Sequence, residues 1–383
     1  MRREDKYFFH VTCAPGLEEG LKEELKEMGI RRLRDGRGAV RFQGTMRVGL
    51  KVALWSQVAS RVLVELTQVS AIDGDDLYEA ILDLPWEERM NLDSTFAIDV
   101  IGTSTTLRHT HYTGQRIKDG ICDRFREKWG KRPNVDPRRP HVLIVARLHR
   151  NRCTISLDLV GERLHRRGYR VEQVEAPLKE NLAAGILRLA GWDGLSPLID
   201  PMCGGGTFVI EGALRAVKVA PGETLEPACL DWPWKGAQCR EIWDDLCEIA
   251  REKSLANSPA LIRASDIRPD NLEAAKANAL QGGVKEEIEW SIRDARELDL
   301  PQGPGWIVCN PPYGERLETI DDAEELMREF GAAWKKTKGF HLAVIAPWEE
   351  LPEWIGQDAV KVVPLRNGKI EGFLTLFAPA QPV

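Results

Sequence analysis

The sequence predicts an α/β protein in which a doubly wound, mostly parallel sheet follows a smaller α+β front half. After Pro177, short apolar strand patterns alternate with helical patterns, which is typical of parallel sheets. Before Pro177, strand and helix patterns are mixed without that regular alternation. The chain has 383 residues, 43% hydrophobic and 29% charged, which is enough for two or three domains with proper cores.

Composition excludes several other classes of protein. The eight cysteines include no CxxC pair, so the sequence signals neither a zinc site nor a disulfide framework. No apolar run approaches the roughly 18 residues that suggest a membrane span, and no signal-peptide pattern follows Met1. We therefore expect a cytoplasmic protein with no metal and no membrane partner.

The front half begins with an expected strand at 7–13. Pro15 and Gly16 end it, and a helix with Leu17, Leu21 and Leu25 on one face follows and stops at Gly29. A returning strand is expected at 38–42. Further strands are expected at 61–66, 95–101, 141–148 and 153–159, and helices at 48–59, 77–82 and 113–128.

The middle of the chain is basic, although the net charge of the whole chain is −6. Lys and Arg outnumber Asp and Glu between residues 101 and 175, and the reverse holds after residue 176. Such a block suggests a polyanion partner, although a solvated arginine-rich face would give the same composition. The candidates for RNA contact are Arg116, Lys118, Arg124, Arg147, Arg150, Arg166 and Arg167.

The second half opens with a helix at 179–190 and a short strand at 197–200. A glycine turn, a helix at 208–217 and a Trp-rich insertion at 221–260 follow, the insertion with a helical part at 242–256. The next elements are a strand at 263–266 and a helix with Asp270 and Glu273 in capping-box spacing. Three more strands are expected at 287–292, 306–309 and 341–346. An edge hairpin at 360–365 and 373–377 then brings the sheet to seven strands. The insertion is equally consistent with a lid, a substrate contact or an interface.

The glycine turn runs from Asp200 to Thr207 at a strand-to-helix junction. Glycines there let the backbone approach a ligand and direct N–H groups at it. The dinucleotide fingerprint is absent because Val209 occupies the third glycine position, and no Lys-Ser/Thr follows to make a Walker loop. Alone, the turn is as consistent with an ordinary loop as with a binding site.

Two acids at neighbouring strand ends favour a binding site. Asp266 can accept from both hydroxyls of a ribose, and Asp294 is placed to accept from an adenine amino group. A ligand that carries an adenosine but no polyphosphate fits acids in these positions. S-adenosylmethionine meets that description, and its sulfonium cation suits an acidic domain.

Asn310-Pro311-Pro312-Tyr313 follows the expected strand at 306–309, where the prolines stop the strand. The Asn310 side-chain oxygen and the Pro311 carbonyl could accept both protons of an exocyclic amine, and Tyr313 could stack on the base. This loop alone does not choose between guanine N2 and adenine N6. Cys203 and Cys309 could serve as nucleophiles in pyrimidine chemistry, but small buried packing residues are much the commoner case.

With these motifs in this order, residues 177–383 resemble a Rossmann-like class I methyltransferase. The resemblance implies that S-adenosylmethionine is the cofactor and that a helix after Lys179-Glu180-Asn181 packs by its methionine part. Gly205 departs from the family, which usually has serine there. The candidate cofactor-binding residues are Lys179, Asn181, Asp200, Pro201, Cys203, Gly204, Gly206, Thr207, Asp266, Ile267, Asp294, Ala295 and Asn310; the catalytic candidates are Asn310, Pro311, Pro312 and Tyr313.

The front half resembles a ferredoxin-like unit at 1–47 and a THUMP RNA-binding domain at 48–160, with a linker at 161–176. His109-Thr110-His111-Tyr112 and the stretch from Leu164 to Arg170 are close to the bacterial 23S rRNA guanine-N2 methyltransferases. The resemblance implies guanine-N2 methylation of RNA, most simply of 23S rRNA. A tRNA substrate and a non-catalytic RNA-binding factor that retains the fold remain alternatives.

Overall fold

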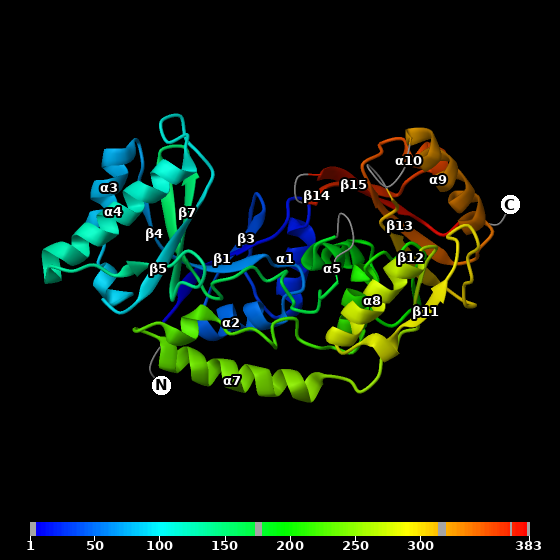
Figure 1. Ribbon diagram of the computed structural model, residues 1–383, viewed down its shortest axis with the longest axis horizontal. Coiled ribbons are helices and arrows are strands. Elements are labelled where there is room, and N and C mark those ends of the chain that lie inside the picture. The colour runs from blue at the N-terminus through cyan, green and yellow to red at the C-terminus, as the bar shows by residue number, and fades with distance from the viewer. Residues whose placement is uncertain (1–4, 173–177, 313–318, 368–369, 381–383) are drawn as a thin grey trace.

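Figure 1 shows the computed structural model, which describes residues 5–172, 178–312, 319–367 and 370–380. Two sheets form two lobes, one for each half of the chain, and helices flank both. The long helix α7 (Gly236–Lys253) runs along one side of the molecule and spans the joint between the lobes. The predicted α/β fold is confirmed, with an α+β front half and a mostly parallel second sheet.

Among the described residues, the front half contains one sheet with the strand order β2-β3-β1-β4-β8-β7-β5-β6. Strand β4 pairs with β1 on one side and β8 on the other, so the sheet is continuous through both predicted front-half units. In chain order the elements are β1 (Tyr7–Thr12), α1 (Glu18–Glu27), β2 (Arg34–Gly36), β3 (Ala39–Gly44), α2 (Met46–Trp55), β4 (Arg61–Ser70), α3 (Gly74–Leu82), η1 (Trp86–Glu88), β5 (Thr95–Ile101), α4 (Thr110–Trp129), β6 (Asn134–Val135), β7 (Val142–His149) and β8 (Arg152–Asp158).

The two faces of this sheet differ because successive strand residues point to opposite sides. Val62, Ile144 and Leu157 point to the side that α3 and α4 cover, and they belong to the main hydrophobic core. The other side carries a separate small apolar cluster made of Leu63, Ala97, Leu143 and Val145. Polar and basic side chains surround that small cluster, which becomes important below.

The second half contains the sheet β11-β10-β9-β12-β13-β15-β14, parallel except where β15 pairs with β13 and β14. Its strands and helices are α5 (Glu180–Leu189), β9 (Leu198–Asp200), α6 (Thr207–Ala216), η2 (Ala228–Asp231), α7, β10 (Ile262–Asp266), α8 (Pro269–Gln281), η3 (Lys285–Glu287), β11 (Glu289–Ile292), β12 (Gly305–Cys309), α9 (Ile320–Lys335), β13 (Phe340–Ala346), α10 (Leu351–Ile355), β14 (Lys361–Asn367) and β15 (Ile370–Phe377).

Several local predictions need correction. Helix α8 begins at Pro269 with Arg268 as its N-cap, and no side-chain cap forms, so the predicted capping box of Asp270 and Glu273 is wrong. Proline fixes φ near the helical value, and it therefore sets the first helical position one residue earlier. The strands β2 and β6 and the helices α9 and α10 were not predicted, nor were the short helices η1, η2 and η3.

The Trp-rich insertion is an interface within the chain. The N–H of Gly222 donates to Leu54 O at 2.9 Å, and the N–H of Cys229 donates to Leu159 O at 3.0 Å. Trp232 is buried and stacks on Trp234, over which the Arg89 guanidinium lies. These contacts bind the insertion, which belongs to the second half by sequence, to the front half. We expect it to hold the two lobes together.

Within the described part of the chain, no helix is long and apolar enough to cross a membrane. No cluster of three or more His, Cys, Asp or Glu side chains suited to a metal ion occurs there either.

Candidate functional site

The candidate site lies at one edge of the second sheet, where the carboxyl ends of four neighbouring strands meet. Parallel pairing aligns Ile307 of β12 with Ile199 of β9, and Ala264 of β10 with Asp200 of β9. Asp266 of β10 is aligned with Ile292 of β11. This register brings Asp200, Asp266, Asp294 and Asn310 to a common edge, the position at which open α/β sheets bind ligands.

The glycine turn is shaped by two residues with left-handed backbone. Gly204 has φ of +51° and Gly206 has φ of +80°, conformations that glycine adopts at little cost. A Cβ on Gly206 would lie 3.0 Å from Cβ of Ala275, whereas one on Gly204 would meet open space. The turn therefore packs closely on α8 and leaves room beside Gly204, as a ligand-binding turn requires.

Asp266 holds the turn in place. Its Oδ2 accepts from the N–H of Gly204 at 2.9 Å. Its Oδ1 accepts from the N–H of Arg268 at 2.9 Å and from Asn271 Nδ2 at 3.1 Å. The acid is buried; Oδ1 already accepts two hydrogen bonds, whereas Oδ2 accepts one and has lone-pair capacity for a further donor. Ile267, the next residue, is exposed.

Asp200 is almost fully buried at the end of β9, and its Oδ1 accepts from the N–H of Met202 at 3.1 Å. Burial raises the pKa of this carboxyl well above its ordinary value. Burial likewise raises the pKa values of the Cys203 and Cys309 thiols. Because a thiol must ionise to act as a nucleophile, this agrees with packing roles for both cysteines. Pro201 and Thr207 are also buried.

Asp294 has a partner that the sequence did not reveal. Arg296 binds its carboxylate through two nitrogens, with Nε 2.9 Å from Oδ1 and Nη2 2.5 Å from Oδ2. The hydrogen bond from Arg296 lowers the pKa of Asp294. A donor that reached Asp294 would therefore share the carboxylate with this guanidinium. Ala295, beside it, is buried.

Asn310 follows β12 directly, and its Oδ1 is a buried acceptor without a hydrogen-bond partner among the described residues. Such an oxygen costs roughly 1–3 kcal/mol unless a donor reaches it, so it is a place where an amino group of a ligand would be stabilised. Pro311 is buried and Pro312 is half-buried. Tyr313, the predicted stacking residue, lies outside the described residues.

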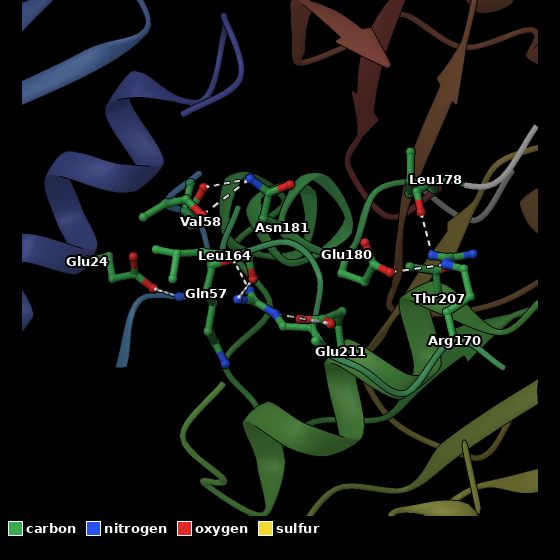
Figure 2. Close-up of polar contacts among 12 residues, drawn as sticks. Glu24, Gln57, Val58, Leu164, Arg170, Leu178, Glu180, Asn181, Thr207 and Glu211 are labelled. Atoms are coloured by element: carbon green, nitrogen blue, oxygen red, sulfur yellow. Dashed lines mark hydrogen bonds and ion pairs between the residues drawn. The ribbon is translucent and has the colours of Figure 1, made fainter. Parts of the chain in front are cut away.

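Lys179 and Asn181 lie at the start of α5. Asn181 Nδ2 donates to Val58 O at 3.2 Å (Figure 2) and to Ser60 Oγ at 3.0 Å, so its amide is engaged with the front half. The residue between them, Glu180, does connect to the glycine turn. Arg170 Nε donates to Glu180 Oε1 at 3.0 Å, and Arg170 Nη2 reaches Thr207 Oγ1 at 3.3 Å. Sequence reasoning missed this bridge.

The predicted RNA-binding cations fall into two groups. Arg167 is buried, and it donates to Leu164 O and Gln57 O, both at 2.6 Å. A phosphate cannot reach it there, so we remove it from the candidates. Arg124 binds Glu87 through two nitrogens and lowers the pKa of that carboxyl to about 2, while Arg116 pairs with Asp75 at 2.7 Å.

The remaining candidates are more accessible. Lys118 pairs with Asp119 at 3.1 Å on the surface. Arg150 is exposed at the turn between β7 and β8, and Arg166 is exposed after β8. Arg147 is half-buried on the open face of the front-half sheet, where its Nη2 donates to Arg37 O at 3.2 Å. The surface of α4 is therefore largely paired, and the sheet face is a better candidate for RNA contact.

Comparison with protein families decides what kind of domain carries this site. Residues 167–375 match the model described as the RMKL-like methyltransferase domain. The chain belongs to the RMKL-like methyltransferase family. This membership confirms the predicted methyltransferase fold and its S-adenosylmethionine cofactor. Residues 72–158 match the THUMP domain and residues 9–63 the RlmL ferredoxin-like domain, which confirms the resemblance of the front half.

Curated relatives extend this family assignment. A ribosomal RNA large subunit methyltransferase K/L of Psychromonas ingrahamii is 39% identical over 380 residues, 98% of this chain and 51% of that protein. The chain thus spans about half the length of the first K/L relatives. A Synechocystis relative is 33% identical over 362 residues and covers 94% of both chains; its name, RNA methyltransferase, is provisional.

Two solved structures share the whole architecture. The crystal structure of SMU.472 complexed with SAH aligns over 100% of both chains with a TM-score of 0.88 and 26% identity. A possible methylase from Clostridium difficile 630 aligns over 99% of this chain with a TM-score of 0.89 and 28% identity. The paired arrangement of front half and methyltransferase half in this chain therefore recurs in solved proteins.

Proposed function

We propose that this chain transfers a methyl group from S-adenosylmethionine to the exocyclic N2 of a guanine in RNA, with 23S rRNA as the substrate. The observation that carries the proposal is the buried Oδ1 of Asn310, which has no hydrogen-bond partner among the described residues and lies beside the glycine turn and its acids. The names of the K/L relatives support large-subunit rRNA, and the THUMP match supports RNA. Guanine N2 rests on the likeness of the Asn-Pro-Pro-Tyr loop to that of the guanine-N2 methyltransferases.

The residues present fit the donor. Room beside Gly204 and the remaining lone pair on Asp266 Oδ2 suit a nucleoside, and the buried acids at the strand ends suit a cation. The donor supplies an electrophilic methyl group. Asp266 and the Gly204 turn would orient it, and Asp294 would share its carboxylate between the adenine amino group and Arg296.

Asn310 would activate the acceptor amine. The lone pair of a guanine amino group is delocalised into the ring, so the nitrogen is a poor nucleophile. Asn310 Oδ1 and the Pro311 carbonyl would accept its two protons and favour a pyramidal nitrogen as the methyl group approaches. These hydrogen bonds strengthen toward the transition state, which is what lowers the barrier. Stacking by Tyr313 on an extruded base completes the proposal.

The test is methyl transfer from labelled S-adenosylmethionine to rRNA and tRNA prepared from a strain that lacks this protein. We expect label on 23S rRNA, in N2-methylguanosine after digestion. Label on tRNA would redirect the proposal to that substrate. Label on a pyrimidine would contradict the assigned chemistry, and RNA binding without any label would indicate a non-catalytic factor.

A further inference from the structure

A cavity of about 340 Å³ lies between the open face of the front-half sheet and the first turn of α5. It contains none of Asp200, Asp266, Asp294 or Asn310, so it is separate from the candidate methyl-transfer site. One side of the cavity is lined by β1, β4, β7 and β8, and the other side by the segment that leads into α5. Most of the lining is polar or charged: His10, Thr12, Arg37, Ser60, Arg61, Arg147, Thr154, Ser156, Arg163, His165, Lys179, Asn181 and Arg366.

The sheet register explains how these side chains meet. Thr12 is paired with Arg61 across β1 and β4, and Arg147 is paired with Thr154 across β7 and β8. Residues two apart on each strand share a face, so all four lie on the side that α3 and α4 leave open. Their position is thus fixed by rigid strands and not by a loop.

The charge of the cavity is one-sided. Among the described residues that line it, six are Arg or Lys and none is Asp or Glu, in a chain whose net charge is −6. Arg61 is balanced by Asp158 and by Asp99, the latter at 3.2 Å. Arg37, Arg163 and Lys179 have no carboxylate partner in the described part of the chain, so their charges remain available for a ligand.

His165 also lines the cavity. Burial, together with the positive charges of Lys179 and Arg163, lowers the pKa of His165 to about 4. The imidazole is therefore neutral near pH 7 and can exchange hydrogen bonds without adding charge. Uncompensated cations around a half-enclosed cavity favour an anion.

The other lining groups indicate which class of anion the cavity can bind. Thr12, Ser60, Thr154 and Ser156 supply hydroxyls suited to a sugar, over an apolar floor that includes Leu63. No Phe, Tyr or Trp side chain is present among the described lining residues, so the cavity lacks the large rings of a base-stacking platform and its only aromatic rings are the imidazoles of His10 and His165. The volume matches a ligand the size of one nucleotide.

We propose that this cavity binds a phosphate–ribose unit of an unpaired stretch of the substrate RNA, apart from the nucleotide that is methylated. This inference rests on the proposed function in one respect, that RNA is the substrate. Contacts to phosphate and sugar position an RNA but carry no sequence information. The cavity therefore anchors the RNA whatever its local sequence. The first turn of α5 contributes to it and, through Glu180 and Arg170, also contacts the glycine turn.

The test compares two double variants with equal changes in charge. Arg37→Gln with Arg163→Gln removes two exposed cations of the cavity that pair with no carboxylate among the described residues. Lys336→Gln with Lys338→Gln removes two exposed cations before β13, at the opposite edge of the second sheet from the candidate site. Binding of short single-stranded oligouridine, oligoadenosine, a blunt RNA duplex and GMP is measured without cofactor. An SAH affinity equal to that of the wild type shows that the methyltransferase half of each variant is intact.

We expect the cavity variant to bind both single strands at least about tenfold more weakly, with the slope of log K against log salt reduced by about 1.4. The control pair should match the wild type. If the cavity variant and the control variant bind the single strands with equal affinity, the proposal is overturned. Tighter binding of GMP or of the duplex than of the single strands would also overturn it. If the wild type methylates no RNA but the single-strand result holds, the proposed function fails while the cavity assignment stands.

Discussion

The backbone N–H of Gly204 donates to Asp266 Oδ2 at 2.9 Å, which ties the glycine turn after β9 to the end of the neighbouring strand β10. Asp266→Asn would replace one acceptor oxygen by a donor group, so one of the three bonds to this side chain must be lost. Hydrogen bonds to charged groups contribute about 1.5–3 kcal/mol. We expect SAH affinity to fall roughly tenfold or more, measured by calorimetry. Asp270→Asn, at an exposed position nearby, is the control; equal affinities would contradict the role of Asp266.

Asn310→Ala should separate catalysis from stability. The substitution removes the acceptor for the amine, so the rate of methyl transfer should fall by roughly 10²–10³ while SAH affinity stays close to that of the wild type. Because the Asn310 oxygen is buried and has no partner in the described part of the chain, its removal should leave the melting temperature unchanged or raised. A variant that keeps its full rate would remove Asn310 from the mechanism.

Asn181→Ala tests whether this residue serves the cofactor or the joint between the lobes. Its amide donates to Val58 O and Ser60 Oγ, and the loss would leave buried acceptors without donors. We expect the free energy of unfolding to fall by about 1–3 kcal/mol, measured by urea denaturation, with little change in SAH affinity. Asn257→Ala, at an exposed position, controls for loss of an amide. Loss of SAH affinity at unchanged stability would restore the cofactor role.

Glu211 should make stability depend on pH. Burial raises its pKa in the folded protein to about 7 from the ordinary 4.5. Between these values the folded state holds a proton that the unfolded state releases, so the free energy of unfolding falls as pH rises, by on the order of 3 kcal/mol in total. Glu211→Gln should flatten the profile between pH 5 and pH 7, measured by urea denaturation. The substitution Glu248→Gln, at an exposed position, should leave the pH dependence of the free energy of unfolding unchanged. If Glu211→Gln also leaves it unchanged, Glu211 is not the source of that dependence.

Arg124→Gln should affect the fold more than RNA binding. Arg124 holds Glu87 with Nη2–Oε1 and Nε–Oε2 distances of 2.8 and 3.2 Å. Loss of this pair should lower the free energy of unfolding by about 1–2 kcal/mol, whereas affinity for RNA should change little. A filter-binding assay beside thermal denaturation checks both. Weaker RNA binding at unchanged stability would mean that Arg124 leaves Glu87 for a phosphate.

Local patterns in the sequence predicted most of the sheet. Strand β5 is observed at the predicted bounds, 95–101, because its alternation and β-branched residues are local properties. Helix α9 was missed although its signal is present. Ala323, Met327, Phe330 and Trp334 have helical spacing, and Thr319 with Asp322 forms a capping box. Both features can be read from the sequence, so this helix was predictable.

The partners of charged and polar side chains could not be predicted in this way. Arg167 and Arg166 are adjacent in sequence, yet one is buried against Gln57 and the other is exposed. Asn181 meets residues about 120 positions earlier. Such pairings depend on how the two lobes pack, which no local pattern encodes. For the same reason the basic character of the middle region was evident from composition, whereas the cavity that gathers Arg37, Arg163 and Lys179 from three separate parts of the chain was not.

The insertion that carries α7 also bears on how such chains can be recombined. In the sequence it lies between α6 and β10 of the methyltransferase half. It nevertheless forms hydrogen bonds with Leu54 and Leu159 of the front half and buries Trp232. A graft that exchanged residues 5–160 alone between two relatives would pair a foreign surface with the original insertion. Residues 221–260 should therefore be inherited together with the front half, as a single module that is discontinuous in the chain.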